Sequence, residues 1–187
     1  AAGPFARAAL LADSGRIGRS GKEIWLSWKS KRMRAAANNQ GSAGLSLMFG
    51  DRETQDEPVI FGRSSGKVEQ FMVQSAWGDA PPPDGKRLSA MIDFDAEAKG
   101  AQDRAIDDRE HSWVARVEFR DGADRVSVWA DAEPANVATA RPHAMLDISS
   151  IEFDRIRLAV NRGDETWRFS DFAMALNPQA LHQLTQV

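Results

Sequence analysis

The sequence of 187 residues predicts an all-β fold in which short antiparallel strands form a sandwich or a barrel. Three observations predict it. Most segments alternate apolar and polar residues with a period of two, clusters of Gly, Asn, Asp and Ser separate these segments, and helical periodicity is scarce. The length suits one domain over residues 1–187, which would bury roughly 70% of the surface that the unfolded chain exposes.

The first half of the chain contains five segments that read as strands: 23–29, 43–50, 57–62, 69–75 and 86–94. In the first, Ile24, Leu26 and Trp28 fall on one face, because successive side chains of a strand point to opposite sides. Trp25 falls on the other face, so one of these two tryptophans is expected to leave the core. Residues 1–20 are ambiguous between helix and strand.

The clearest unit of the second half is a hairpin over residues 111–131, with a polar loop at Asp121-Gly122-Ala123-Asp124. Its first strand directs Trp113 and the apolar residues that alternate with it to one face, and Arg116 and Glu118 to the other.

Two further strands are expected at 151–160 and 166–176. A short helix follows at 177–184, where Asn177 is a suitable N-cap and Pro178 a suitable first helical residue. Residues 77–87 and 95–111 are expected to be long loops.

The order of these segments resembles a known family. The segments EIWLSWKSKR, GSAGLSLMFGD, PVIFGR, HSWVARVEFRDGADRVSVWADAEP and SSIEFDRIRLAV…WRFSDFAMAL follow one another as in the concanavalin A-like, LamG-type jelly rolls of exported bacterial proteins. The resemblance covers about residues 22–176 and implies an antiparallel jelly-roll β-sandwich. Members of that family carry further strands upstream. Three alternatives follow: residues 1–20 replace those strands, the chain is a fragment, or a partner covers the exposed edge.

Glu152 and Asp154 lie two apart in the segment 151–160 and raise the question of a catalytic pair. Glucanases that resemble this fold carry E-x-D-x-x-E on one strand, but the third position is Arg157 in this chain. A retaining mechanism then lacks its proton donor. The apolar residues before and after Asp154 also have opposite parity, which predicts a bulge or bend there. We expect Glu152 and Asp154 to be a polar-face pair, and we assign no catalytic residue.

Calcium is a possible cofactor. Asp93 and Asp95 alternate as oxygen ligands do in a calcium loop, although the residues needed to complete an EF-hand are absent. LamG-type folds often bind one calcium ion near loop or end-strand carboxylates, and the resemblance adds Asp171 to the candidates. The alternative is a solvated acidic loop.

Six tryptophans and no tyrosine make aromatic sugar platforms the main candidates for a binding site. Trp25, Trp77 and Trp129 are the residues most expected to leave the core, and core packing is the alternative for each. The basic run of Lys29, Lys31, Arg32 and Arg34 is expected beyond the first strand. It would meet an anionic partner there or be an ordinary solvated loop.

The net charge of −3 argues against a nucleic-acid binder, and no segment approaches the roughly 20 apolar residues of a membrane span. The absence of cysteine and the start without Met are compatible with an extracytoplasmic protein, whether periplasmic, secreted or on the cell surface. We expect a non-catalytic, lectin-like module that binds carbohydrate or a surface. The alternatives are an accessory subunit that docks onto a protein assembly and, third, a glycoside hydrolase.

Overall fold

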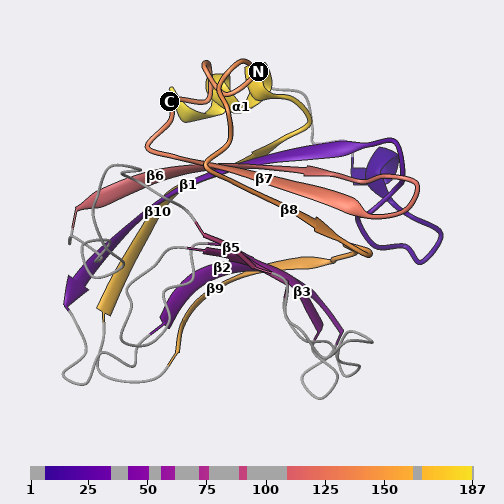
Figure 1. Ribbon diagram of the computed structural model, residues 1–187, viewed down its shortest axis with the longest axis horizontal. Helices are drawn as coiled ribbons and strands as arrows, with labels where there is room; N and C mark the ends of the chain where they lie inside the picture. Colours follow the sequence, from indigo (N-terminus) through magenta and orange to yellow (C-terminus); the bar gives the residue numbers. More distant parts are fainter. Residues whose placement is uncertain are drawn as a thin grey trace.

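The protein is a sandwich of two five-stranded antiparallel sheets (Figure 1). A computed structural model describes residues 7–34, 42–50, 56–61, 72–75, 89–91, 109–161 and 166–186. The predicted all-β class is confirmed, and so is the short helix near the end of the sequence, α1 (Pro178–Thr185).

The first sheet has the strand order β10 (Thr166–Ala175), β1 (Glu23–Arg34), β6 (Glu110–Glu118), β7 (Asp124–Ala130) and β8 (Ala144–Ile148). The second has the order β5 (Ser89–Met91), β4 (Met72–Gln74), β3 (Asp56–Phe61), β2 (Ser42–Phe49) and β9 (Arg155–Asn161). The chain crosses between the sheets after β1, β5, β8 and β9. This winding gives the predicted jelly roll, with β9 and β10 at the same side of the sandwich.

The core lies between the sheets and follows the predicted alternation. Trp28 of β1 stacks on Trp113 of β6 with ring centroids 6.1 Å apart and contacts Phe61 of the opposite sheet at 5.7 Å. The apolar residues of the 111–131 hairpin that were expected to share a face are all buried in this core. Burial of such large side chains is the main force that holds the two sheets together.

Residues 7–22, the described part of the N-terminal segment, do not supply a strand to either sheet. A single 3-10 turn, η1 (Arg7–Leu10), is followed by Ile17, which forms an isolated bridge with Phe153. The two residues exchange backbone hydrogen bonds of 2.8 and 3.0 Å, and Leu10 and Ile17 are buried in the core. This part of the sequence therefore closes one end of the sandwich by short contacts.

The first strand is longer than predicted. We expected the basic run 29–34 beyond the strand, but β1 continues to Arg34. Strand alternation consequently separates the four cations: Lys29 and Lys31 point to the outer face, whereas Arg32 is buried at 7% exposure. The expected position of the run beyond the strand was wrong, whereas the binding of an anionic partner by these residues stays a prediction.

Candidate ligand-binding groove

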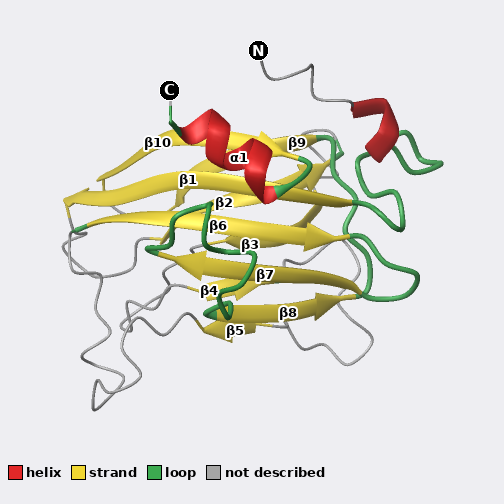
Figure 2. Ribbon diagram, turned by 90° about the horizontal axis from the view of Figure 1, so that it is seen from above, coloured by secondary structure: helices red, strands yellow, loops and turns green. Residues whose placement is uncertain are grey.

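The outer face of the first sheet carries a groove of about 660 Å³. Its floor consists of side chains from β1, β6 and β7 that point away from the core. Its walls are residues 137–142 of the loop between β7 and β8 and residues 177–179 at the start of α1. Figure 2 shows the helix lying across β10 and β1, beside the loop. A volume of this size is in the range of small-ligand sites, about 300–1,000 Å³.

A row of ion pairs forms much of the floor. Arg116 donates from Nε to Oε2 of Glu23 at 2.8 Å, and its Nη2 lies 3.1 Å from Oε1 of Glu118. Arg120 contacts the other oxygen of Glu118 at 3.2 Å. The strand register produces this row, because Glu118 of β6 lies between Glu23 on β1 and Arg125 on β7. Arg116 lies two residues along β6, between Trp25 and Ser127.

The row ends in a bidentate pair at the edge of the groove. Arg125 donates from Nε and Nη2 to the two carboxylate oxygens of Asp147 on β8, at 2.7 and 2.8 Å. The hydrogen bond from Arg125 lowers the pKa of Asp147, although burial opposes it slightly. Asp147 therefore stays ionised to a lower pH than an ordinary aspartate, and the two hydrogen bonds hold Arg125 in a fixed orientation.

Two indoles lie beside the ion pairs. Trp25 and Trp129 stack with ring centroids 5.7 Å apart and planes 21° from parallel. Nε1 of Trp25 donates to Glu23 at 2.8 Å, and Nε1 of Trp129 donates to the carbonyl of Ala140 at 2.9 Å. The guanidinium of Arg116 lies 5.4 Å from the Trp25 ring. The indoles thereby fix both the floor and the loop wall.

One buried hydroxyl on the floor is available to a ligand. Ser127 of β7 is only 5% exposed and lines the groove. Its Oγ forms no hydrogen bond with any residue that the structure describes. The hydroxyl therefore keeps its capacity to donate and to accept a hydrogen bond for a ligand in the groove.

Trp25 and Trp129 lie on the outer face, as their parity predicted, but they are not the exposed platforms that we expected. Each is 4% exposed, because Leu181 of α1 and Val137 of the loop pack over them. Among the tryptophans in the described ranges, Trp28 and Trp113 are also buried and Trp167 is half-buried. Trp77 lies outside the described residues.

Asp171 is the calcium candidate that the structure describes. Its carboxylate forms an ion pair of 2.7 Å with the ammonium group of Lys29. No group of three or more His, Asp or Glu residues within the described ranges could hold a metal ion. Asp93 and Asp95 lie outside those ranges, and calcium remains a prediction for them.

Glu152 and Asp154 lie away from the groove. Glu152 accepts a hydrogen bond of 2.7 Å from Ser14, and Asp154 pairs with the adjacent Arg155 at 2.8 Å. Strand β9 begins only at Arg155, after a bend at Asp154. The predicted break in the strand is confirmed, and the two carboxylates occupy the polar contacts expected of a surface pair.

The alternation of β6 already placed Arg116 and Glu118 on the face away from the core. Their partners Glu23, Arg125 and Asp147 come from three other strands, so sequence reasoning missed the row. Strand register decides which residues meet, and alternation alone does not specify it.

No family model matches the chain, and no curated protein matches it. Among solved structures, the chain is similar to an alginate lyase from Pseudomonas aeruginosa at 14% identity and a TM-score of 0.49, over 88% of this chain and 70% of the lyase. It is also similar to a tetrameric galectin from the ball sponge Cinachyrella sp. at 9% identity and a TM-score of 0.39, over 86% of this chain and 94% of the galectin. None of the described helices is long and apolar enough to cross a membrane. What this chain binds is therefore inferred from the groove itself.

Proposed function

We propose that the protein is a non-catalytic carbohydrate-recognition module that binds a neutral glycan in the groove on the outer face of the first sheet. The observation that carries this proposal is the row of paired arginines and carboxylates beside Ser127, whose hydroxyl forms no hydrogen bond with a described residue. As part of the same proposal the module acts outside the cytoplasm, which cell fractionation of the producing organism would test.

The ion-pair row suits hydroxyl groups because it offers both donors and acceptors. A guanidinium has five N–H donors and a carboxylate accepts at about four sites, so the pairs in the row leave part of this capacity free. A sugar hydroxyl both donates and accepts and can use both kinds of group. The row also holds its side chains in place before a ligand arrives, which reduces the entropy lost on binding.

The charge balance favours a neutral ligand over a charged one. Arg116 is matched by Glu23 and Glu118, and Arg125 is matched by Asp147. An anionic ligand would have to compete with these carboxylates for the same guanidinium groups. A neutral ligand adds hydrogen bonds without breaking an ion pair, so its binding should depend only weakly on salt.

The experiment is a glycan array of neutral and acidic oligosaccharides, followed by calorimetric titration of each neutral ligand found. Ser127→Ala removes the groove hydroxyl without adding an atom and should weaken binding about fivefold, the value of one hydrogen bond of about 1 kcal/mol. Ser149→Ala is the matched control, because Ser149 is exposed beyond β8 and does not line the groove. Absence of binding to every glycan would contradict the proposal, as would equal loss in both variants.

Docking onto a protein assembly is the second candidate, and the edge strand β9 favours it. Leu158 and Val160 are 47% and 41% exposed on this edge. An edge strand with exposed apolar side chains can pair with an extended strand of another protein. Native mass spectrometry of protein purified from its own cells tests this candidate, and Leu158→Lys should release a partner held at this edge.

A further inference from the structure

The groove is the first of three hollows that follow one seam. The seam is the line along which α1 lies beside residues 132–138 of the loop between β7 and β8. The middle hollow, of about 200 Å³, shares Ala138, Pro178 and Gln179 with the groove. The end hollow, of about 250 Å³, shares Pro134 with the middle one and lies at Thr185 and Gln186, at the other end of the helix.

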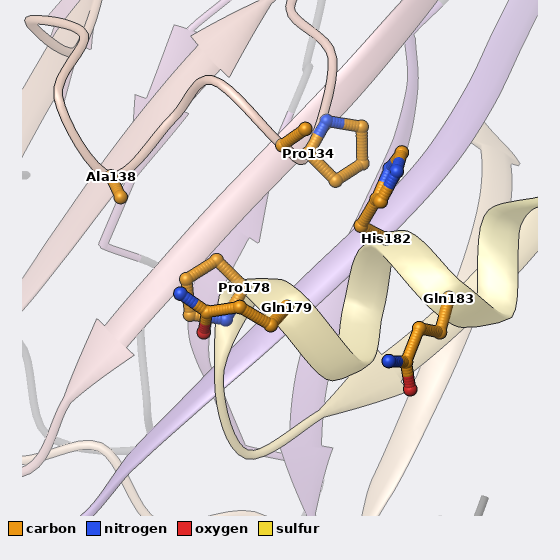
Figure 3. A pocket seen from close by; sticks show the side chains of 7 residues that line it. Pro134, Ala138, Pro178, Gln179, His182 and Gln183 are labelled. Carbon is orange, nitrogen blue, oxygen red and sulfur yellow. The ribbon is translucent and has the colours of Figure 1, made fainter.

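The middle hollow contains an unsatisfied polar atom. Nδ1 of His182 is buried and has no hydrogen-bond partner among the described residues. Figure 3 shows the imidazole on α1 beside Pro134, with Gln179 and Gln183 on the same helix. Two prolines and two alanines supply the apolar part of the lining. The hollow thus combines apolar contact with a few polar groups, as sites for small ligands do.

The end hollow is polar and contains backbone strain. Lys29 and Asp171 form their 2.7 Å ion pair in it, and Ser27 lies beside them at only 8% exposure, with no hydrogen bond from its Oγ to a described residue. Asp171 has a φ of 53°, and Asp131, just before the lining residue Ala132, has a φ of 51°. These two are the positive-φ residues other than glycine in the described ranges. Strain of this kind is often found at functional positions.

We propose that the seam is one extended cleft for a linear, neutral oligosaccharide, which reaches from the groove past His182 to the pair of Lys29 and Asp171. This inference rests on the function proposed above and adds that the ligand is a chain of several sugar units. The eight residues of α1 span about 12 Å, so a single sugar in the groove would not reach the end hollow. Each hollow is lined by a polar side chain that forms no hydrogen bond with any described residue: Ser127, His182 and Ser27 in turn.

Chain length is the variable that tests the cleft. Cello-, laminari-, manno- and xylo-oligosaccharides, each from the monosaccharide to the hexasaccharide, are titrated into the full chain by calorimetry. In at least one series we expect the hexasaccharide to bind roughly tenfold more tightly than the disaccharide, which corresponds to about 1.4 kcal/mol from contacts beyond the groove.

A variant in which the middle hollow is filled distinguishes ligand contacts along the seam from a general increase of affinity with ligand length. Ala135 is exposed and lines only the middle hollow, so Ala135→Trp should reduce hexasaccharide affinity to that of the disaccharide and leave the disaccharide unaffected. Asn136→Trp is the matched control, since the adjacent side chain lines none of the three hollows. Circular dichroism checks the fold of both variants.

The outcomes are distinct. Equal affinity for the disaccharide and the hexasaccharide, or a length gain that survives Ala135→Trp, would overturn the extended cleft and leave glycan binding in the groove intact. Absence of binding by every sugar would overturn both proposals. If the protein binds an extended peptide and no sugar, and Ala135→Trp abolishes that binding, the assignment of a carbohydrate ligand would be overturned.

Discussion

Trp25 and Trp129 stack on the outer face of the first sheet, 5.7 Å apart, and both are almost fully covered by α1 and the loop between β7 and β8. This contact forms a second hydrophobic cluster, separate from the core between the sheets. It attaches the helix and the loop, and therefore both walls of the groove, to the sandwich. The geometry of the candidate site depends on this pair.

Trp129→Ala should lower the free energy of unfolding by about 3–5 kcal/mol, because it removes a buried indole and leaves a cavity under the loop. The hydrogen bond to the carbonyl of Ala140 is lost as well. Urea denaturation measures the change. Met145→Ala, at an exposed residue of the groove rim, is the control and should cost less than about 1 kcal/mol. A loss below about 1 kcal/mol for Trp129→Ala would show that the second hydrophobic cluster contributes little to the free energy of unfolding.

Asp124 joins two loops at one end of the sandwich. Its carboxylate accepts hydrogen bonds from the backbone N–H groups of Arg120 at 2.7 Å and Ile151 at 2.6 Å, and it is 5% exposed. Asp124→Ala leaves two donors without a partner and should cost about 2–4 kcal/mol in a denaturant titration. Asp121→Ala in the same turn, where the side chain is exposed, should cost less than about 1 kcal/mol. Equal losses of unfolding free energy in Asp124→Ala and Asp121→Ala would contradict the proposed role of Asp124 in joining the two loops.

The pair of Arg125 and Asp147 should make stability depend on pH in acid solution. Because the pKa of Asp147 is lowered in the folded protein, its ionisation stabilises the fold above the ordinary value of 3.8. This contribution is lost as the pH falls through the lowered pKa. The stability difference between the wild type and Asp147→Asn should therefore shrink below pH 3.8. Carbon-13 titration of the carboxyl group checks the direction, and an unshifted pKa would contradict the pair.

Gly18 lies where the N-terminal segment packs closely against residues 151 and 152, just before β9. A Cβ at Gly18 would lie 2.8 Å from the carbonyl oxygen of Ile151 and 2.9 Å from Cγ of Glu152, whereas a Cβ at Gly15 would meet nothing within 4 Å. Both glycines have positive φ, so Gly15→Ala measures the backbone cost alone, about 1–2 kcal/mol. Gly18→Ala should lower the melting temperature by more than this control. An equal shift would mean that the close approach is not structurally important.

Sequence reasoning predicted the elements whose pattern is local. The hairpin of β6 and β7 directs alternate apolar residues to the core on both sides of Gly122. Helix α1 carries its cap at Asn177, whose side chain accepts from the N–H of Ala180. Strand β8 was missed, although its five residues alternate in burial. Met145 is apolar but exposed, so the run Ala144-Met145-Leu146 shows no alternation of apolar and polar residues in the sequence.

Sequence reasoning could not predict the cover over Trp25 and Trp129. Alternation assigned both indoles to the face opposite the core, but whether that face meets solvent depends on elements distant in the chain. Leu181 and Val137 bury the indoles and come from such elements. The hollows along the seam have the same origin, since α1 and the loop between β7 and β8 form them only after both have packed on the sheet.

The most direct measurement is a nitrogen-15 NMR titration of the wild type with a neutral oligosaccharide selected on the array. The indole N–H groups of Trp25 and Trp129 report on the groove, because they bond to Glu23 and Ala140 at its floor and wall. Their signals should shift together with the backbone signals of Ser127 and Gln179, while the indole signal of core Trp28 stays constant and added salt changes little. Shifts confined to β9, or saturating binding without any change at Trp25, Trp129 and Ser127, would contradict recognition in the groove.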